Sequence, residues 1–142
     1  MFGKVIAGVD GGDGGRDAIA LASRLLAEDC ELVLANVRAK LPTRYTPLSA
    51  TIDDERDSIE LLEREREAAE LSAELVSCEA QSPGRGLHVL AEQRGADLIV
   101  VGSTARGALG RIALGDDTRA ALNGAPCAVA IATRGYREHP RD

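Results

Sequence analysis

Residues 97–117 read DLIVVGSTARGALGRIALGDD, and this stretch decides the fold. Leu98–Val101 is a short apolar run typical of a buried parallel strand, and a glycine-rich segment and a helix start follow it. Glycine lets backbone N–H groups approach an anion closely, and a helix N-terminus adds a partial positive charge. A strand, a glycine-rich loop and a helix start in this order indicate a site for a phosphate group.

Outward from this stretch, apolar strand patterns alternate with helical patterns along the chain. The spacing of apolar residues predicts helices over residues 17–27, 53–72, 83–94 and, shorter, 117–122. Apolar runs predict strands over residues 4–10, 31–37, 74–80, 96–101 and 126–131. We expect one domain over residues 1–133 and a polar, frayed tail over residues 134–142.

This alternation predicts an open, five-stranded parallel α/β sheet with helices on both faces. Right-handed crossovers give the strand order 3-2-1-4-5 when the first strand is central. The winding direction then reverses between the first and fourth strands, and ligands of such sheets bind outside the carboxyl ends at that point. The two most glycine-rich loops, after Asp10 and after Val101, follow those two strands, so we expect a crevice between them.

Composition excludes several functions. Aromatic residues make up only 2% of the chain and the net charge is −6, which argues against nucleic-acid binding. The chain has no run of eighteen apolar residues, so we expect no membrane span. Its three cysteines show no CxxC spacing and no signal peptide is visible, which predicts a cytoplasmic protein. The charge run over residues 63–67 is interpreted as a solvated helix face.

The glycine-rich segment does not follow the common phosphate-loop patterns. Gly102 and Gly107 have the GxxxxG spacing of an NTPase loop, but Ala108–Leu109 stand where lysine and a hydroxyl residue are needed. Gly110 and Gly115 repeat the spacing and are followed by two aspartates. No GxGxxG follows the first strand. The sequence therefore predicts neither a P-loop NTPase nor a dinucleotide-binding protein.

The arrangement resembles the universal stress protein family, whose ATP-binding members carry a G-x2-G-x9-G-[S/T] motif after the fourth strand. Gly102 and Gly115 have the separation that the first and last glycines of this motif require. Val9–Gly11 resembles the family's VDGS phrase, and Ala125–Val129 resembles its APCPV segment before the fifth strand. The resemblance covers nearly the whole chain and implies an adenine nucleotide alpha hydrolase-like fold.

The chain departs from the family's pattern at three positions. Ala105 stands for the second motif glycine, Asp116 for the final hydroxyl residue and Gly12 for the serine of VDGS. Asp116 is also a favoured helix N-cap residue, and in that role it would occupy the N–H donors that a phosphate needs. Two adjacent aspartates would repel a triphosphate as well. We therefore expect weak or no ATP binding and no required cofactor.

The resemblance implies a nucleotide site made of Val9, Asp10, Val37, Val101, Gly102, Ser103, Ala105, Gly115 and Asp116. In such a site Asp10 would contact the ribose or adenine region, and Val37 and Val101 would flank the base. Each residue type also has a structural alternative. These alternatives are an Asx turn for Asp10, core packing for the two valines, backbone shape alone for Gly102 and Gly115, and a backbone hydrogen bond for Ser103.

We predict no catalytic and no metal-binding residues. His88 and His139 are the only histidines, they lack metal-ligand spacing, and no GxSxG elbow is present. The resemblance implies a stress-response binding or regulatory protein that forms a homodimer through the fifth strand and acts on an unidentified protein partner. The alternatives are a nucleotide switch that binds ATP or another adenine nucleotide, and a nucleotide alpha hydrolase-like enzyme.

Overall fold

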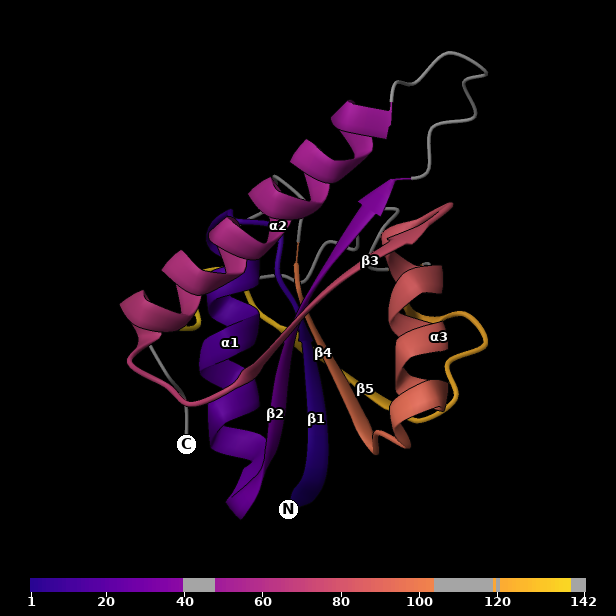
Figure 1. The fold of residues 1–142 in the computed structure, drawn as a ribbon. Helices are drawn as coiled ribbons and strands as arrows, with labels where there is room; N and C mark the ends of the chain where they lie inside the picture. The colour runs from indigo at the N-terminus through magenta and orange to yellow at the C-terminus, as the bar shows by residue number, and fades with distance from the viewer. Residues whose placement is uncertain (40–47, 104–118, 120, 139–142) are drawn as a thin grey trace.

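The computed structural model describes residues 1–39, 48–103, 119 and 121–138. These residues form a five-stranded parallel sheet in the order β3-β2-β1-β4-β5, with helices packed against it (Figure 1). In chain order the elements are β1 (Phe2–Gly8), α1 (Asp13–Leu25), β2 (Leu26–Ala39), α2 (Leu48–Ala69), β3 (Glu74–Ala80), α3 (Pro83–Arg94), β4 (Leu98–Gly102) and β5 (Ala128–Ala132). The predicted fold class and strand order are confirmed.

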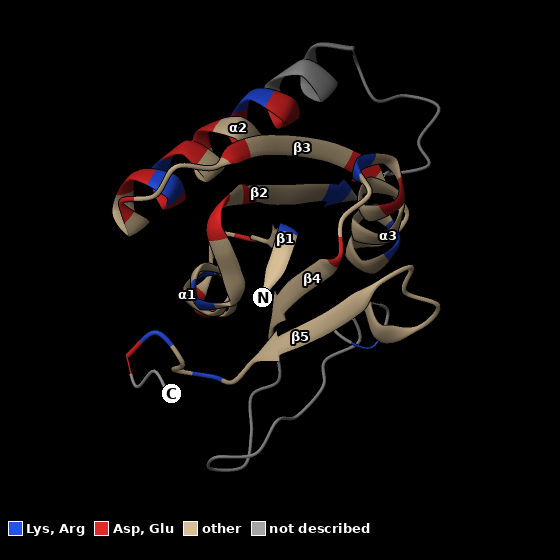
Figure 2. Ribbon diagram, turned by 90° about the horizontal axis from the view of Figure 1, so that it is seen from below, with Lys and Arg blue, Asp and Glu red and all other residues tan. Residues whose placement is uncertain are grey.

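Helices cover both faces of the sheet, with α1 and α2 on one face and α3 on the other (Figure 2). Val5 and Leu34 belong to the core under α1 and α2, and Ile6 and Val33 belong to the core under α3. Successive residues of one strand thus serve opposite faces, because side chains alternate along a strand. This two-sided burial explains the continuous apolar runs in the sequence.

β3 has the predicted bounds, and α3 begins and ends at the signals seen in the sequence. The Ser82 hydroxyl oxygen caps α3 by accepting a hydrogen bond from the Arg85 N–H at 3.3 Å, and Pro83 follows the cap. Gly95 ends the helix in the left-handed conformation, with φ of 63°. Both capping signals involve residues next to one another in the chain, so the ends of this helix can be predicted from the sequence alone.

Several other elements begin earlier than predicted. β1 begins at Phe2 rather than residue 4, and α2 begins at Leu48 rather than residue 53. β2 is 14 residues long because it starts directly after α1, with a left-handed φ of 58° at Asp29 before the predicted strand. α1 begins at Asp13 rather than residue 17, so its first turn contains two glycines. β4 and β5 lie within two residues of their predicted bounds. Of the short helix predicted over 117–122, residues 119, 121 and 122 are described and are helical, and the other three fall outside the described residues.

Residues 135–137, in the described part of the predicted tail, lie against α1. The N–H groups of Gly135 and Arg137 donate hydrogen bonds to the Asp17 carboxylate at 2.9 and 3.0 Å. The Arg137 side chain also bonds Asp13, at 3.0 Å. Asp17 is only 1% exposed. A buried carboxylate of α1 therefore fixes residues 135–137 against the helix.

The charged segment of α2 is only partly the solvated face that was predicted. Glu63, Arg64 and Glu67 are exposed, but Glu65 is buried. The Glu65 carboxylate accepts hydrogen bonds from the Arg16 guanidinium of α1, the shortest at 3.2 Å. One member of the charge run thus joins two helices. None of the described helices is both long and apolar enough to span a membrane.

Candidate functional site

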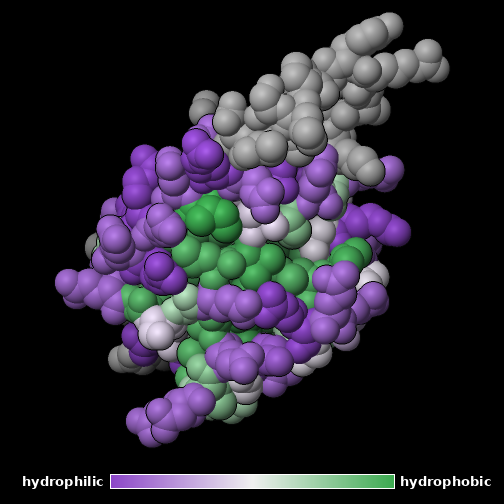
Figure 3. All heavy atoms as spheres, in the orientation of Figure 1, coloured by the Kyte–Doolittle hydropathy of each residue, from purple (hydrophilic) through white to green (hydrophobic). Residues whose placement is uncertain are grey.

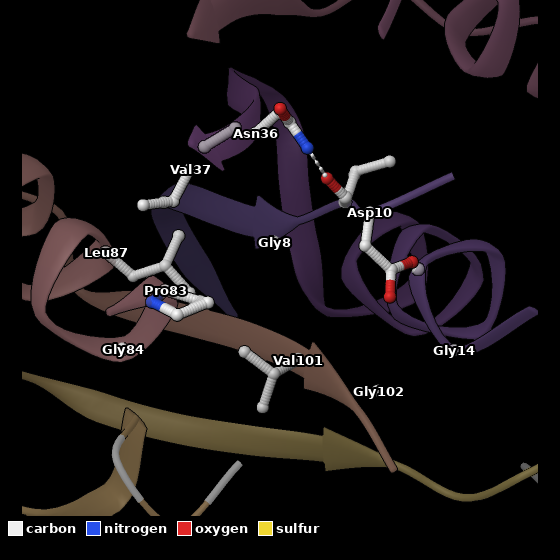
Figure 4. A pocket seen from close by; sticks show the side chains of 13 residues that line it. Gly8, Asp10, Gly14, Asn36, Val37, Pro83, Gly84, Leu87, Val101 and Gly102 are labelled. Carbon is white, nitrogen blue, oxygen red and sulfur yellow. Dashed lines mark hydrogen bonds between the residues drawn. The ribbon is translucent and has the colours of Figure 1, made fainter. Parts of the chain in front are cut away.

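A cavity of about 110 Å³ lies at the carboxyl ends of β1, β2 and β4, where the winding of the sheet reverses. The N-terminal turns of α1 and α3 complete its wall (Figure 4). This is the crevice expected between the first and fourth strands. Parallel strands bring their carboxyl ends to one edge of the sheet, so residues far apart in the chain meet here.

The cavity has an apolar interior. The side chains of Val37, Leu87 and Val101 point into it from β2, α3 and β4, and Pro83 closes one side (Figure 4). Asp10 is the only ionisable side chain among the described residues that line it. A lining of this kind suits a flat, weakly polar group better than a highly charged one.

Asp10 follows β1 and lies beside the start of α1 (Figure 4). Its Oδ1 accepts a hydrogen bond from the Gly12 N–H at 2.8 Å, which is the turn given as the structural alternative for this residue. Asp10 is exposed. Because a carboxylate has two acceptor oxygens, this turn and a contact with a ligand hydroxyl are compatible.

Gly102 has a backbone role that only glycine can fill. The end of β4 lies so close to the first turn of α1 that a Cβ on Gly102 would overlap the backbone of Gly14. Gly14 and Gly102 both line the cavity. The close approach of strand to helix therefore determines the shape of the site on this side.

Asn36 also lines the cavity, although it belongs to none of the motifs that predict the site. Its Nδ2 donates a hydrogen bond to the Val9 carbonyl oxygen at 2.7 Å, which ties the end of β2 to the segment after β1 (Figure 4). Its Oδ1 accepts a hydrogen bond from the Ser58 hydroxyl of α2 at 2.7 Å, and the Ser77 hydroxyl of β3 donates to Ser58 at 2.7 Å. The sequence does carry one sign of this role, since Asn36 is a lone amide within an apolar strand. A buried polar group needs hydrogen-bond partners, so such a residue is expected to bond to neighbouring segments.

The structure brings together Val9, Asp10, Val37, Val101 and Gly102 of the predicted site, all of which line the cavity. Ser103 follows directly in the chain and is buried. Three predicted site residues, Ala105, Gly115 and Asp116, lie outside the described residues. The ligand roles assigned to all of these residues stay predictions.

The other candidate chemical groups lie away from the cavity. His88 is on α3, half-buried, with Nε2 2.6 Å from the Ala121 carbonyl oxygen, so it has a structural partner. Burial raises the pKa of the Cys78 and Cys127 thiols, which keeps them protonated at neutral pH. Within the described part of the chain, no three His, Cys, Asp or Glu side chains gather in a way that could hold a metal ion.

Comparison with known proteins agrees with this architecture. The sequence model of the universal stress protein family matches residues 1–133. The fold is similar to that of UspA from Lactobacillus plantarum, at 24% identity and a TM-score of 0.64, over 91% of this chain and 96% of that one. It is similar to a universal stress protein in complex with cAMP, at 20% identity and a TM-score of 0.69, over 94% and 98% of the two chains. It is also similar to a universal stress protein family protein from Arabidopsis thaliana with AMP bound, at 16% identity and a TM-score of 0.62. That match covers 98% of this chain and 96% of the other. No match was found among curated proteins.

Proposed function

Since the chain belongs to the universal stress protein family, we propose that it is a cytoplasmic binding or regulatory protein of the stress response. Its site binds the adenosine part of an adenine nucleotide. The observation that carries the proposal is the cavity at the switch point of the sheet, lined by five of the residues predicted for such a site. Two solved proteins of similar fold hold cAMP or AMP. Asp10 has no ionisable neighbour in the described lining, which supports binding rather than turnover.

The apolar walls favour the base over the phosphates. Val37, Leu87 and Val101 offer aliphatic surface on which a purine would lie, and Asp10 offers a carboxylate to a ribose hydroxyl at the rim. At about 110 Å³ the cavity is smaller than a typical ligand pocket, which measures about 300–1,000 Å³. The described residues can therefore enclose only part of a nucleotide, and the base is the part that matches their chemistry.

Negative charge at the site disfavours a triphosphate. Asp10 lines the cavity, and the sequence places Asp116 and Asp117 at the end of the altered motif, with Arg106 and Arg111 nearby in the chain to offset part of that charge. The N-terminus of α1 carries only about half a positive charge, which suits one phosphate better than three. We therefore expect this protein to bind AMP at least as tightly as ATP.

Calorimetric titration with adenosine, AMP and MgATP tests this proposal. The expected result is measurable binding of adenosine and AMP, with ATP no tighter than AMP. A dissociation constant for MgATP in the low micromolar range, well below that for AMP, would instead support an ATP-binding nucleotide switch. Absence of binding by all three ligands would refute the nucleotide site itself.

A repair of the motif tests the cause of weak ATP binding. The double variant Asp116→Ser with Ala105→Gly should bind MgATP about tenfold more tightly, since it frees helix N–H donors and lets the backbone approach a phosphate. The matched control is Asp117→Ser, which removes the same charge outside the motif. A folded double variant that binds ATP no better than the control would show that these two positions do not block the site.

A further inference from the structure

α1 begins with weak local signals, because the acidic Asp13 in its first turn stands beside glycines. Its N-cap is Gly12, which makes no side-chain cap, and Gly14 and Gly15 fall in its first turn. Glycine is the least favourable helix residue after proline, and an uncapped end leaves N–H groups without partners. The position of this turn therefore depends on contacts with other parts of the molecule.

On its inner side, the first turn of α1 forms part of the candidate site. Gly14 and Gly15 line the cavity, and the Gly14 backbone lies directly against Gly102 of β4. A small shift of this turn would change both the width of the cavity and the direction of the helix N–H groups. The site thus needs the start of α1 to be held in place.

On its outer side, the same turn is held by the segment that follows β5. Asp17, one turn into α1, accepts hydrogen bonds from the N–H groups of Gly135 and Arg137 through its two carboxylate oxygens. The Arg137 guanidinium bonds Asp13 in the first turn. Figure 2 shows this segment leaving the end of β5 and passing beside α1.

We propose that residues 134–138, here called the C-terminal clasp, hold the first two turns of α1 in the position that the nucleotide site requires, with Asp17 as the positioning residue. Asp17 is 1% exposed, and a carboxylate so deeply buried is tolerated only while its oxygens accept hydrogen bonds. Release of the clasp would leave these oxygens without partners, so α1 would have to move to bring them to water. The family model matches residues 1–133, so the clasp directly follows the matched region.

Amide hydrogen exchange of the full chain without nucleotide tests the clasp. The variant Asp17→Asn keeps the side-chain shape but turns one acceptor oxygen into a donor that faces an N–H group. The probe is the Arg16 amide, which donates to the Gly12 carbonyl at 3.3 Å, and the internal reference is the Gly86 amide in the first turn of α3, which donates to Ser82 at 3.1 Å. We expect Arg16 to exchange about tenfold faster or more, with Gly86 unchanged.

Two further variants separate the clasp from general destabilisation. Arg137→Ala removes the bond to Asp13 but keeps the backbone donor, and should accelerate exchange of Arg16 by a smaller factor. Arg134→Ala changes an exposed arginine of the same segment and should have no effect. Unchanged exchange of Arg16 in Asp17→Asn, or equal acceleration of Gly86, would overturn the proposal.

The link from the clasp to binding rests on the proposed function and has its own measurement. The dissociation constant for AMP should rise several-fold in Asp17→Asn and stay the same in Arg134→Ala. Unchanged AMP binding together with faster Arg16 exchange would overturn the positioning role. If the wild type binds no adenine nucleotide, the proposed function fails, while the exchange data alone still decide whether the clasp holds α1.

Discussion

At the scale of single residues, short polar side chains fix the backbone, both at the site and at the opposite end of the sheet. Asp10 bonds the Gly12 N–H, Asn36 bonds the Val9 carbonyl, and Asp97 bonds two N–H groups at the start of β1. Each of these bonds joins a side chain to backbone, which is the commonest kind of side-chain hydrogen bond in proteins. The turn at Asp10 could be predicted because its partner is two residues away. The partners of Asn36 could not, because Ser58 and Val9 are 22 and 27 residues away and only the fold brings them together.

Asp97 gives a pH prediction at this scale. Hydrogen bonds from the N–H groups of Gly3 and then Lys4, each 3.0 Å long, hold the pKa of its carboxyl below the ordinary value. Because the folded pKa is the lower one, the stabilisation is fully present above about pH 4 and is lost as the pH falls through the folded pKa. Asp97→Asn should therefore lower the Tm at neutral pH by a few degrees, with a difference that shrinks in acid.

The measurement is a series of thermal unfolding curves from neutral to acidic pH for the wild type and Asp97→Asn. Asp54→Asn, at an exposed aspartate on α2, is the matched control and should leave the Tm unchanged. A Tm difference for Asp97→Asn that stays constant across the whole range would contradict the assignment of the effect to the ionised carboxylate.

At the scale of elements, the sequence determined the type and order of strands and helices better than their first residues. The ends of α3 could be read directly, since Ser82, Pro83 and Gly95 are local signals. The start of α1 could not be read, because it depends on contacts between Asp17 and backbone N–H groups 118 and 120 residues away. Helix propensity argued against the two glycines of that turn, and tertiary contacts outweighed it.

The packing of α3 on β2 gives a prediction at the same scale. A Cβ on Gly86 would lie 2.6 Å from Val37 Cγ1 and 3.2 Å from the Ala80 Cβ, so Gly86→Ala forces the helix and the strand apart. We expect a loss of about 1–3 kcal/mol in the free energy of unfolding, the usual cost of overpacking. Val37 lines the cavity, so AMP binding should weaken as well.

The double variant Gly86→Ala with Val37→Ala checks this cause, because the smaller side chain leaves room for the added methyl group. Its unfolding free energy, measured in urea, should be higher than the sum of the two single losses predicts. Strictly additive losses would show that the two residues do not compete for the same space.

At the scale of the whole molecule, the part of the sheet that the structure describes has an open edge at β3 and another at β5. On the face seen in Figure 3, hydrophobic residues gather over the middle of the molecule, where β3 crosses in Figure 1, and hydrophilic residues surround them. β3 carries exposed Glu74 and Glu79, and charges of this kind protect an edge from pairing. β5, with the sequence AVAIA, carries no charge. The β5 edge is therefore the one that we propose pairs with a second copy of the chain.

The register of β5 shows which residues such a homodimer would use. The Ser103 N–H donates to the Ala132 carbonyl at 3.1 Å, so the polar backbone groups of Ala132 face β4. Because these groups alternate in direction along a strand, those of Ala130 also face β4, while those of Val129 and Ile131 face the open edge. A twofold axis would pair the Val129 and Ile131 groups with the same groups of a second chain, as a self-complementary contact requires.

Val129→Pro tests this homodimer, because it removes an N–H that faces the open edge and not one bonded to β4. Val129→Ala is the control, since it loses a similar part of the side chain but keeps the donor. By light scattering we expect the wild type and Val129→Ala to be dimers and Val129→Pro to be a monomer, with circular dichroism confirming that all three are folded. A monomeric wild type at tens of micromolar, or a folded Val129→Pro that remains dimeric, would rule out β5 as the interface.

AMP titration of the monomeric variant then separates assembly from binding. The described lining of the cavity comes from β1, β2, β4, α1 and α3 and not from β5, so AMP affinity should survive the loss of the dimer.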